Sequence, residues 1–320
     1  MPGKQCKSGP KGETAKIPMQ HPSCYVCGSA KIIDFCTARD RLGGGVWRIV
    51  RCNDCGFGWT FPPLAEDQIP AYYPTAYLGD TRKILDDFFS GRLARSRSWR
   101  GELQKVRLVE HYIEGGKILD VGCGDGKFLW ALDAQRWEKS GVEASRDTVA
   151  MVAKRMPSIH LIAGSIDSEE LNANTHDAVT FWHVLEHLPQ PRKVLRRAYD
   201  LLRPGGWLFI SLPDVDSLQA RLFRQNWYPF GDVPRHIFHF SRRSLDLLLN
   251  EAGMTVQGHR LFSPLVNFHS LKHSLLQWSE EQTGGRIPYY ALKPLLFAFP
   301  LLERCTGKYG ILTTIAQKPG

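Results

Sequence analysis

The spacing of apolar positions along the chain changes near Gly116. Beyond this residue, short runs of apolar residues alternate with segments whose apolar residues recur every three or four positions, the spacing of a helix face. The runs predict strands at Lys117–Val121, Trp137–Glu143, Ile159–Ala163, Asp177–Trp182, Trp207–Leu212, Met254–Phe262 and Gly310–Gln317. The other segments predict helices at Lys127–Gln135, Arg146–Arg155, Pro191–Leu202 and Arg243–Glu251. This alternation favours an α/β fold, a doubly wound sheet with helices on both faces.

The first 115 residues lack this alternation. Residues 1–20 are rich in Lys, Gly, Pro and Ser, a composition typical of a disordered tail. Within residues 21–62, β-prone runs at 31–35 and 46–50 flank three consecutive glycines, which predicts a small β-hairpin module. Residues 63–115 are a Pro- and Tyr-rich connector and a basic helical lead-in, and we expect one large domain over residues 116–320.

Residues 263–309, between the last two predicted strands, form an insertion far longer than a hairpin connection needs. Its residues 289–302 are mostly apolar, but a lysine and two prolines interrupt them. A packed lid, a cap over an apolar substrate, a dimer face and contact with a membrane surface all remain open for this run. No run reaches the ~18 apolar residues of a membrane span, and no signal-peptide pattern is present. We therefore expect a cytoplasmic protein, with peripheral membrane contact through residues 289–302 as an alternative.

Four of the eight cysteines form two Cys-x-x-Cys pairs, Cys24 with Cys27 and Cys52 with Cys55, separated by 24 residues. A glycine follows each pair, which allows a tight turn around the sulfur atoms. Four thiolates at this spacing suit tetrahedral zinc, and a complete shell of four cysteines indicates a structural role. A module of this size has too small a core to fold alone, so metal binding would supply its folding free energy.

Glycines at 122, 124 and 126 directly follow the first strand of the large domain, and Asp120 lies within the end of that strand. Such a turn lets a ligand approach the backbone and predicts a nucleotide-type cofactor. The next strand ends in Glu143. An acid at this position can accept hydrogen bonds from both ribose hydroxyls of an adenosyl group.

From Gly116 onward the chain resembles the class I S-adenosylmethionine-dependent methyltransferases. The resemblance rests on the segments ILDVGCGDGKFL, GVEAS, HDAVTFWHVLEHLPQP and LLRPGGWLFISLPD, which occur in the order and spacing of that family. It implies a seven-stranded Rossmann-like sheet with a reversed last strand, preceded here by a small zinc-ribbon domain. It also implies that S-adenosylmethionine lies over the carboxyl ends of the early strands.

The resemblance assigns cofactor-binding roles by position. Gly122 and Gly124 line the cofactor, Asp120 supports its methionine end, and Glu143 holds the ribose. Many relatives place an acid that contacts adenine where this chain has Ser165, so adenine recognition falls to Ser165, to Asp167 or to backbone groups.

Methyl transfer to a hydroxyl or carbon acceptor needs a base, and histidine suits this role near neutral pH. His236 is the first candidate and His187 the second, with a structural role as the alternative for each, while His183 packs against the cofactor. The pair Glu186-His187 also resembles the metal-binding run of some quinone-biosynthesis O-methyltransferases. Those relatives carry a further Glu where this chain has His183, which leaves a catalytic metal open.

The leading interpretation is a zinc-ribbon methyltransferase of a small molecule. Zinc-binding modules fused to this fold resemble methyltransferases of nucleotide-linked sugars and of polysaccharide or natural-product intermediates, and the net charge of +9 suits a phosphate-bearing substrate. A second interpretation is O-methylation of a lipid-like quinone or polyketide, suggested by the apolar insertion. A third is a zinc-ribbon RNA-binding protein or RNA methyltransferase. The weak basic bias between Cys24 and Cys55 argues against nucleic acid, and nothing in the sequence indicates the oligomeric state.

Overall fold

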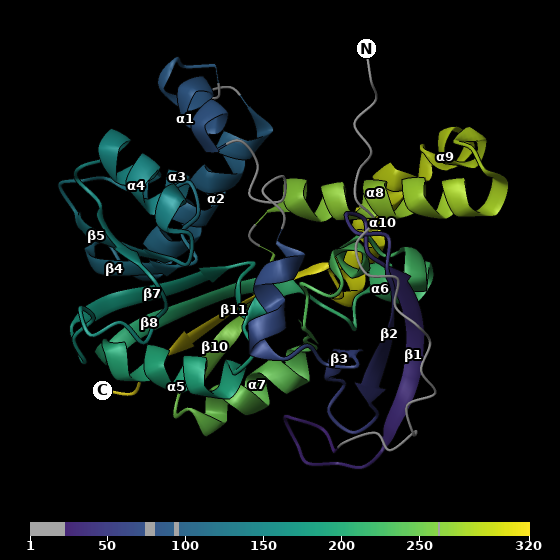
Figure 1. Cartoon of the computed structure of the whole chain (residues 1–320), viewed down its shortest axis with the longest axis horizontal. Coiled ribbons are helices and arrows are strands. Elements are labelled where there is room, and N and C mark those ends of the chain that lie inside the picture. The colour runs from purple at the N-terminus through teal and green to yellow at the C-terminus, as the bar shows by residue number, and fades with distance from the viewer. Residues whose placement is uncertain (1–22, 74–80, 93–95, 262) are drawn as a thin grey trace.

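The structure is a computed structural model that describes residues 23–73, 81–92, 96–261 and 263–320. Its centre is a seven-stranded sheet in the order β10-β11-β8-β7-β4-β5-β6 (Figure 1). The strands are β4 Gly116–Val121, β5 Trp137–Glu143, β6 His160–Ala163, β7 His176–Trp182, β8 Leu202–Pro213, β10 Thr255–Arg260 and β11 Ile311–Gln317. Strands β6, β5, β4, β7 and β8 are parallel, whereas β11 is antiparallel to both β8 and β10. This arrangement is the doubly wound sheet with a reversed last strand that the sequence predicts.

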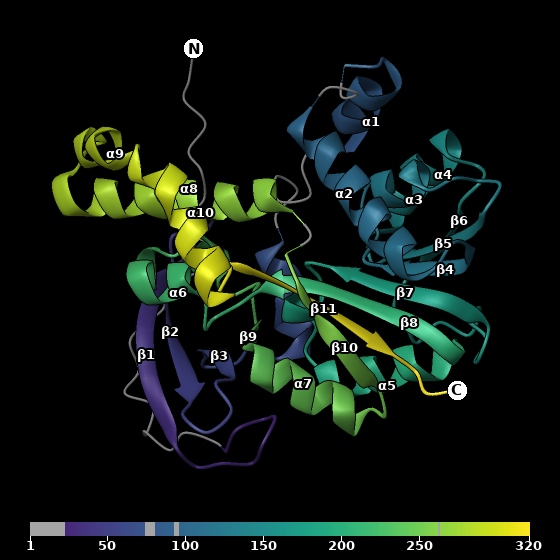
Figure 2. The ribbon, with the colours of Figure 1, turned by 180° about the vertical axis from the view of Figure 1, so that it is seen from behind.

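Helices cover both faces of this sheet (Figures 1 and 2). One face carries α1 Thr81–Phe89, α2 Arg97–Tyr112, α3 Lys127–Ala131 and α4 Arg146–Arg155, and the other carries α5 Pro191–Leu201 and α7 Arg242–Glu251. Successive side chains of a strand point to opposite faces. Accordingly, Ile118 of β4 packs with Val109 of α2, and Leu119 packs in the other core with Leu195 of α5.

Two predicted helices differ from those observed. The lead-in from 81 to 113 is two helices, α1 and α2, and their separation includes Gly91 at a φ of +78°, a conformation that ends a helix. Helix α3 ends at Ala131 rather than at Gln135, because Leu132 is extended and the carboxylate of Asp133 accepts a hydrogen bond from the Gln135 N–H instead. The tail expected at residues 1–20 lies outside the described residues.

The cysteine-rich module, residues 23–62, is called the ribbon below. Its strands β1 Ile32–Arg39, β2 Val46–Cys52 and β3 Gly58–Phe61 form an antiparallel sheet. A fourth strand, β9 Phe238–His239, comes from the large domain and pairs with β3. The hairpin predicted from the sequence is therefore present as β1 and β2, but the prediction lacked β3 and β9. The core is also shared, since Val50 and Trp59 of the ribbon belong to the same buried cluster as Leu245 of α7.

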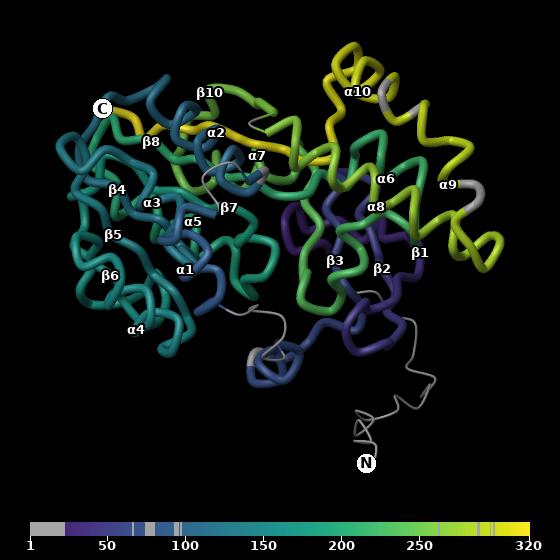
Figure 3. Tube along the Cα trace, turned by 90° about the horizontal axis from the view of Figure 1, so that it is seen from above, coloured from purple at the N-terminus to yellow at the C-terminus, as the bar shows by residue number. Residues whose placement is uncertain are grey.

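The insertion between β10 and β11 is helical and lies beside the ribbon at one end of the molecule (Figure 3). It consists of α8 Pro264–Thr283, α9 Ile287–Leu292 and α10 Leu295–Thr306. Leu271 and Leu275 of α8 pack in one buried cluster with Ile49 of β2. In the apolar run 289–302, Leu296 is buried, but Leu301 and Leu302 are 64% and 57% exposed. Among the described residues, no helix is long and apolar enough to cross a membrane.

The remaining short elements lie in the connections between the longer helices and strands. They are α6 Leu218–Phe223 and the 3-10 helices η1 Glu66–Tyr72, η2 Leu185–His187, η3 Arg224–Asn226 and η4 Tyr228–Asp232. Helix η2 directly follows β7, and η4 precedes the histidines of the segment 233–240. These two elements bring the candidate catalytic histidines to the carboxyl end of the sheet.

Candidate functional site

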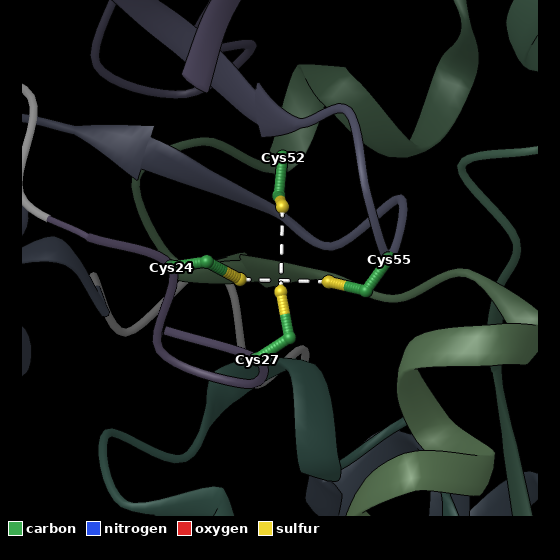
Figure 4. Close-up of side chains that lie close together, drawn as sticks. All are labelled: Cys24, Cys27, Cys52 and Cys55. Atoms are coloured by element: carbon green, nitrogen blue, oxygen red, sulfur yellow. Dashed lines mark hydrogen bonds between the residues drawn. The ribbon is translucent and has the colours of Figure 1, made fainter. Parts of the chain in front are cut away.

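The four cysteines of the ribbon converge on one point (Figure 4). The Sγ atoms of Cys24 and Cys55 are 3.5 Å apart, those of Cys27 and Cys52 are 3.6 Å apart, and all four lie within 4.8 Å of one another. A zinc ion at about 2.3 Å from each sulfur of a tetrahedron requires sulfur–sulfur edges of about 3.8 Å. The four thiols therefore have the identity, number and spacing of a structural zinc site.

The electrostatics of this cluster fit the same ion. Donation of a hydrogen bond by the Cys55 thiol lowers the pKa of Cys24 to about 5, and the pKa of Cys55 is raised in turn by the neighbouring Cys24. Crowded thiols without a cation cannot all ionise, because like charges at this separation repel. A divalent cation at the centre removes that repulsion and favours four thiolates.

The predicted cofactor residues lie together at the carboxyl ends of β4, β5, β6 and β7. Gly122 and Gly124 form the turn after β4, with φ values of +71° and +53° that favour glycine. A side chain at Gly122 would collide with Val184, since a Cβ there would be 2.6 Å from a Val184 methyl carbon. A Cβ at Gly124 would meet no heavy atom within 4 Å. One glycine is thus required by packing, and the other borders open space.

Glu143 is held at the end of β5 by backbone donors. Its Oε2 accepts from the Gly124 N–H at 3.1 Å, and its Oε1 accepts from the Ser145 N–H at 3.0 Å. The carboxylate therefore faces the glycine turn and is half-buried there. Ser165, past the end of β6, is exposed and its hydroxyl accepts from the Asp167 N–H at 3.2 Å.

Asp120 lies deeper than the other cofactor candidates. Its side chain is buried and accepts a hydrogen bond of 2.6 Å from the hydroxyl of Thr180 on the neighbouring strand β7. Burial raises the pKa of Asp120 to about 7. The carboxyl group is thus bonded to strand β7 at the end of β4, two residues before the glycine turn.

The candidate histidines meet in a cluster that we call the acceptor cluster: Tyr73, Glu186, His187 and His236, of which Glu186 and His236 are buried and the other two half-buried. The rings of His187 and His236 are 4.7 Å apart between centroids and nearly perpendicular. The Nδ1 atom of His187 lies 3.0 Å from the Tyr73 hydroxyl and 3.1 Å from the Arg235 carbonyl oxygen. Burial lowers the pKa of both histidines, that of His236 to well below its usual value. Both imidazoles are consequently neutral at pH 7.

Glu186 differs from the other members because it is buried without a donor. It is 1% exposed, and neither carboxylate oxygen accepts a hydrogen bond from any described residue. The imidazole of His183 lies beside it, with Nδ1 3.5 Å from Oε1, and the His183 backbone has a φ of +59°. The ligand atoms of Glu186, His187 and His236 lie within 4.8 Å of one another, close enough to share a metal ion. An oxygen and two imidazoles are a donor set that divalent transition metals accept.

Sequence reasoning missed three residues around this cluster. Tyr73 comes from the connector, Asp40 from the ribbon, and the Arg235 side chain is 1% exposed and paired with Asp40. No local signal marks the first two, because their partners lie 114 and 195 positions away in the chain. Arg235 stands beside His236 in the sequence, but a basic residue is ordinarily exposed.

Comparison with known proteins explains the arrangement at the strand ends. A family model described as a methyltransferase domain matches residues 93–259. The chain belongs to this methyltransferase family. The match includes every predicted cofactor and catalytic residue and excludes the ribbon and the whole insertion. The fold and the family together make this chain a class I S-adenosylmethionine-dependent methyltransferase.

Curated relatives of this methyltransferase include ubiquinone biosynthesis O-methyltransferases. The protein of that name from Chromobacterium violaceum is 33% identical over 173 residues, which are 50% of this chain and 74% of the relative. The one from Hydrogenovibrio crunogenus is 30% identical over 187 residues, 53% of this chain and 77% of the relative. A solved structure of Haemonchus contortus phosphoethanolamine N-methyltransferase 2 with S-adenosyl-L-methionine has a TM-score of 0.53 and 16% identity, covering 90% of this chain and 69% of that one. That likeness shows the fold.

Proposed function

We propose that this methyltransferase transfers a methyl group from S-adenosylmethionine to a small molecule, with a nucleotide-linked sugar or a related polysaccharide or natural-product intermediate as its acceptor class. The observation that carries the proposal is the pair His187 and His236, two neutral imidazoles enclosed at the same sheet edge as the glycine turn. Such an enclosure suits a small acceptor from which a proton must be removed.

The cofactor residues follow from the strand ends. The open backbone at Gly124 gives the cofactor its contact surface, with Gly122 forming the turn and Asp120, bonded to β7, two residues before it. Glu143 would hold the ribose hydroxyls, Ser165 would lie near the adenine, and His183 would pack beside the reacting end. S-adenosylmethionine supplies an electrophilic methyl group on a sulfonium. The protein's task is then alignment of the acceptor and removal of its proton.

The acceptor cluster supplies the base. In one tautomer of His187 the Tyr73 hydroxyl, 3.0 Å from Nδ1, donates to that nitrogen; in the other, Nδ1 carries the proton and donates to the Arg235 carbonyl at 3.1 Å, which can only accept. Our proposal takes the second arrangement, the Nδ1–H tautomer. That tautomer leaves a lone pair on Nε2, which can take a proton from the acceptor. His236 lies against His187, and its ring makes no hydrogen bond with the described residues that would prevent it from taking the same role.

A direct experiment identifies the acceptor. The protein is incubated with methyl-labelled S-adenosylmethionine and two sets of candidates, nucleotide-linked deoxysugars and demethylated quinone precursors. Label in the first set supports the proposal, and label confined to the second set contradicts it. His236→Ala should lower turnover at least ~100-fold, the usual contribution of a general base, with cofactor affinity little changed. His160→Ala is the matched control, because that histidine is 61% exposed and its partner among the described residues is Glu170 at 3.6 Å.

O-methylation of a quinone-like phenol is the second candidate, favoured by two observations. First, curated relatives of this chain carry the name ubiquinone biosynthesis O-methyltransferase. Second, the buried carboxylate of Glu186 lies close enough to His187 and His236 for the three side chains to hold a divalent cation. Such a cation would lower the pKa of an acceptor hydroxyl. Activity that chelators abolish and Mg²⁺ or Zn²⁺ restores, measured on a quinone precursor, would favour this candidate over the first.

The RNA interpretation has less support. Four of the five basic residues between Cys24 and Cys55 form ion pairs with carboxylates: Lys31 with Asp54, Arg41 with Asp232, Arg48 with Asp34, and Arg51 with Asp216. These carboxylates offset part of the positive charge that would attract phosphates. Salt-sensitive binding of RNA by the intact protein would revive this interpretation.

A further inference from the structure

The histidine segment, residues 231–241, bonds to the ribbon as well as to the large domain. Strand β9 pairs with β3 through Gly58 opposite His239 and Trp59 opposite Phe238. Thr60 extends this pairing upstream, since its N–H donates to the Ile237 carbonyl at 2.9 Å and its hydroxyl donates to the His236 carbonyl at 2.7 Å. The backbone that carries the candidate base His236 therefore leads directly into an edge strand of the ribbon sheet, and the His236 carbonyl accepts from Thr60 of that sheet.

A buried ion pair joins the same segment to the other end of the ribbon. The Arg235 guanidinium donates to Asp40 Oδ1 at 2.7 Å, and these side chains are 1% and 3% exposed. Asp232 is a second, more distant carboxylate at 3.4 Å. At such burial, charge attraction is far less screened than at the surface. The Asp40 pair thus fixes where the Arg235 side chain lies.

Asp40 is itself fixed by the turn between β1 and β2. Its Oδ1 accepts from the Leu42 N–H and its Oδ2 accepts from the Gly43 N–H, both at 2.9 Å. Glycine at 43 is required by this contact, because a Cβ there would lie 2.6 Å from Oδ2. The carboxylate is consequently preorganised before it meets Arg235, and little freedom is lost on pairing.

The Arg235 residue connects this ion pair to the acceptor cluster. Its side chain contacts the ribbon, and its peptide carbonyl lies 3.1 Å from Nδ1 of His187. That carbonyl can only accept, so it favours the Nδ1–H tautomer of His187, whereas the Tyr73 hydroxyl at 3.0 Å from the same nitrogen can pair with either tautomer. A shift of the Arg235 backbone by a few tenths of an ångström would weaken this hydrogen bond, whose strength falls with distance and misalignment.

We propose that Asp40 is a positioning residue for the methyl-acceptor side of the site: by holding the Arg235 side chain, it places the Arg235 carbonyl that selects the tautomer of His187. The ribbon thus has a role beyond folding, as one wall of the acceptor site. The expected effect on methyl transfer rests on the proposed function, in which His187 or its neighbour accepts a proton. The control of the His187 tautomer by Asp40 does not depend on that function.

The test compares two single substitutions in the ribbon of the full chain. Asp40→Asn keeps the shape of the side chain and removes its charge. Asp34→Asn is the matched control, because Asp34 is 53% exposed in its pair with Arg48 and belongs to the same sheet. The tautomer of His187 is read from ¹⁵N chemical shifts of histidine-labelled protein at a fixed pH of about 8, above the usual histidine pKa, and His187→Gln assigns the signal.

We expect a single Nδ1–H tautomer in the wild type and in Asp34→Asn. In Asp40→Asn the tautomer ratio should shift by roughly fivefold, the effect of weakening one hydrogen bond, with the Kd for S-adenosylmethionine unchanged within about twofold. Asp40→Asn leaves the buried Arg235 charge without its main partner. Asp40→Asn with Arg235→Met removes both charges, and should shift the tautomer in the same direction even where the single variant folds poorly.

An unchanged tautomer in both variants overturns the inference. A shifted tautomer supports it, whatever happens to turnover. Turnover then tests the proposed function separately: a shifted tautomer with an unchanged rate of methyl transfer would show that His187 is not the base. His236→Ala, measured beside these variants, would show whether its neighbour is.

Discussion

Alanine substitutions at two neighbouring glycines separate the needs of the cofactor from the needs of the fold. Gly122 and Gly124 both have positive φ, at +71° and +53°, where an L-residue costs about 1–2 kcal/mol. They differ in space. A Cβ at Gly122 would lie 2.6 and 3.0 Å from the two methyl carbons of Val184, whereas one at Gly124 would meet no heavy atom within 4 Å. The two variants therefore share the backbone strain and differ in the steric contact.

The magnitudes follow from these distances. Gly122→Ala adds an overpacking cost of about 1–3 kcal/mol, so the free energy of unfolding should fall by about 2–5 kcal/mol in total. The melting temperature should then fall by roughly 4–10 °C, against roughly 2–4 °C for Gly124→Ala. Cofactor binding should report on Gly124 instead, because a methyl group there fills the space that we assign to S-adenosylmethionine. We expect its Kd to rise at least ~10-fold, equivalent to about 1.4 kcal/mol.

Thermal melting followed by circular dichroism and titration calorimetry with S-adenosylmethionine measure the two quantities. Val184→Ala in the Gly122→Ala background removes the colliding methyl groups and should recover part of the lost melting temperature. No recovery would show that the steric argument at Gly122 is wrong. Unchanged cofactor affinity in Gly124→Ala would refute the placement of the cofactor against this turn.

Two further predictions concern the metal site and pH. Cys27→Ser and Cys55→Ser should each reduce bound zinc from about one per chain to near zero and lower the melting temperature. The control is Cys305→Ser, because Cys305 is exposed and lies outside the cluster. Wild-type protein that is purified without chelators and contains no zinc would contradict the assignment. Burial lowers the pKa of His239 to about 3. Below about pH 6.5 the unfolded chain therefore binds a proton at this residue that the folded chain does not. This difference should lower the free energy of unfolding by about 1.4 kcal/mol for each pH unit between pH 6 and pH 4. Denaturant unfolding of His239→Gln should show a shallower loss than the wild type; comparing the two cancels the opposite contribution of the buried acids Asp120 and Asp214, whose pKa values are raised to about 7 and about 6. Equal slopes would show that His239 does not titrate in this way.

The local sequence pattern was sufficient to predict those parts of the structure that depend on residues close together in the chain. The strands β4, β5, β7 and β8, the glycine turn after β4 and the two Cys-x-x-Cys pairs each follow from a few consecutive residues. Their chemistry is local as well: apolar runs bury as strands, positive φ favours glycine, and two thiolates on one turn form half of a zinc shell. The resemblance to the family added the seven-stranded sheet and its reversed last strand.

Tertiary structure alone decided what surrounds the histidines. Strand β9 has only the two residues Phe238 and His239, too few for a periodic pattern, and exists because β3 offers an unpaired edge. The pairing of Asp40 with Arg235 joins residues 195 positions apart, and the sequence around either residue does not indicate its partner. A buried charge is tolerated only where an opposite charge meets it. The fold brings Asp40 and Arg235 together, and it thereby places the ribbon beside the candidate base His236.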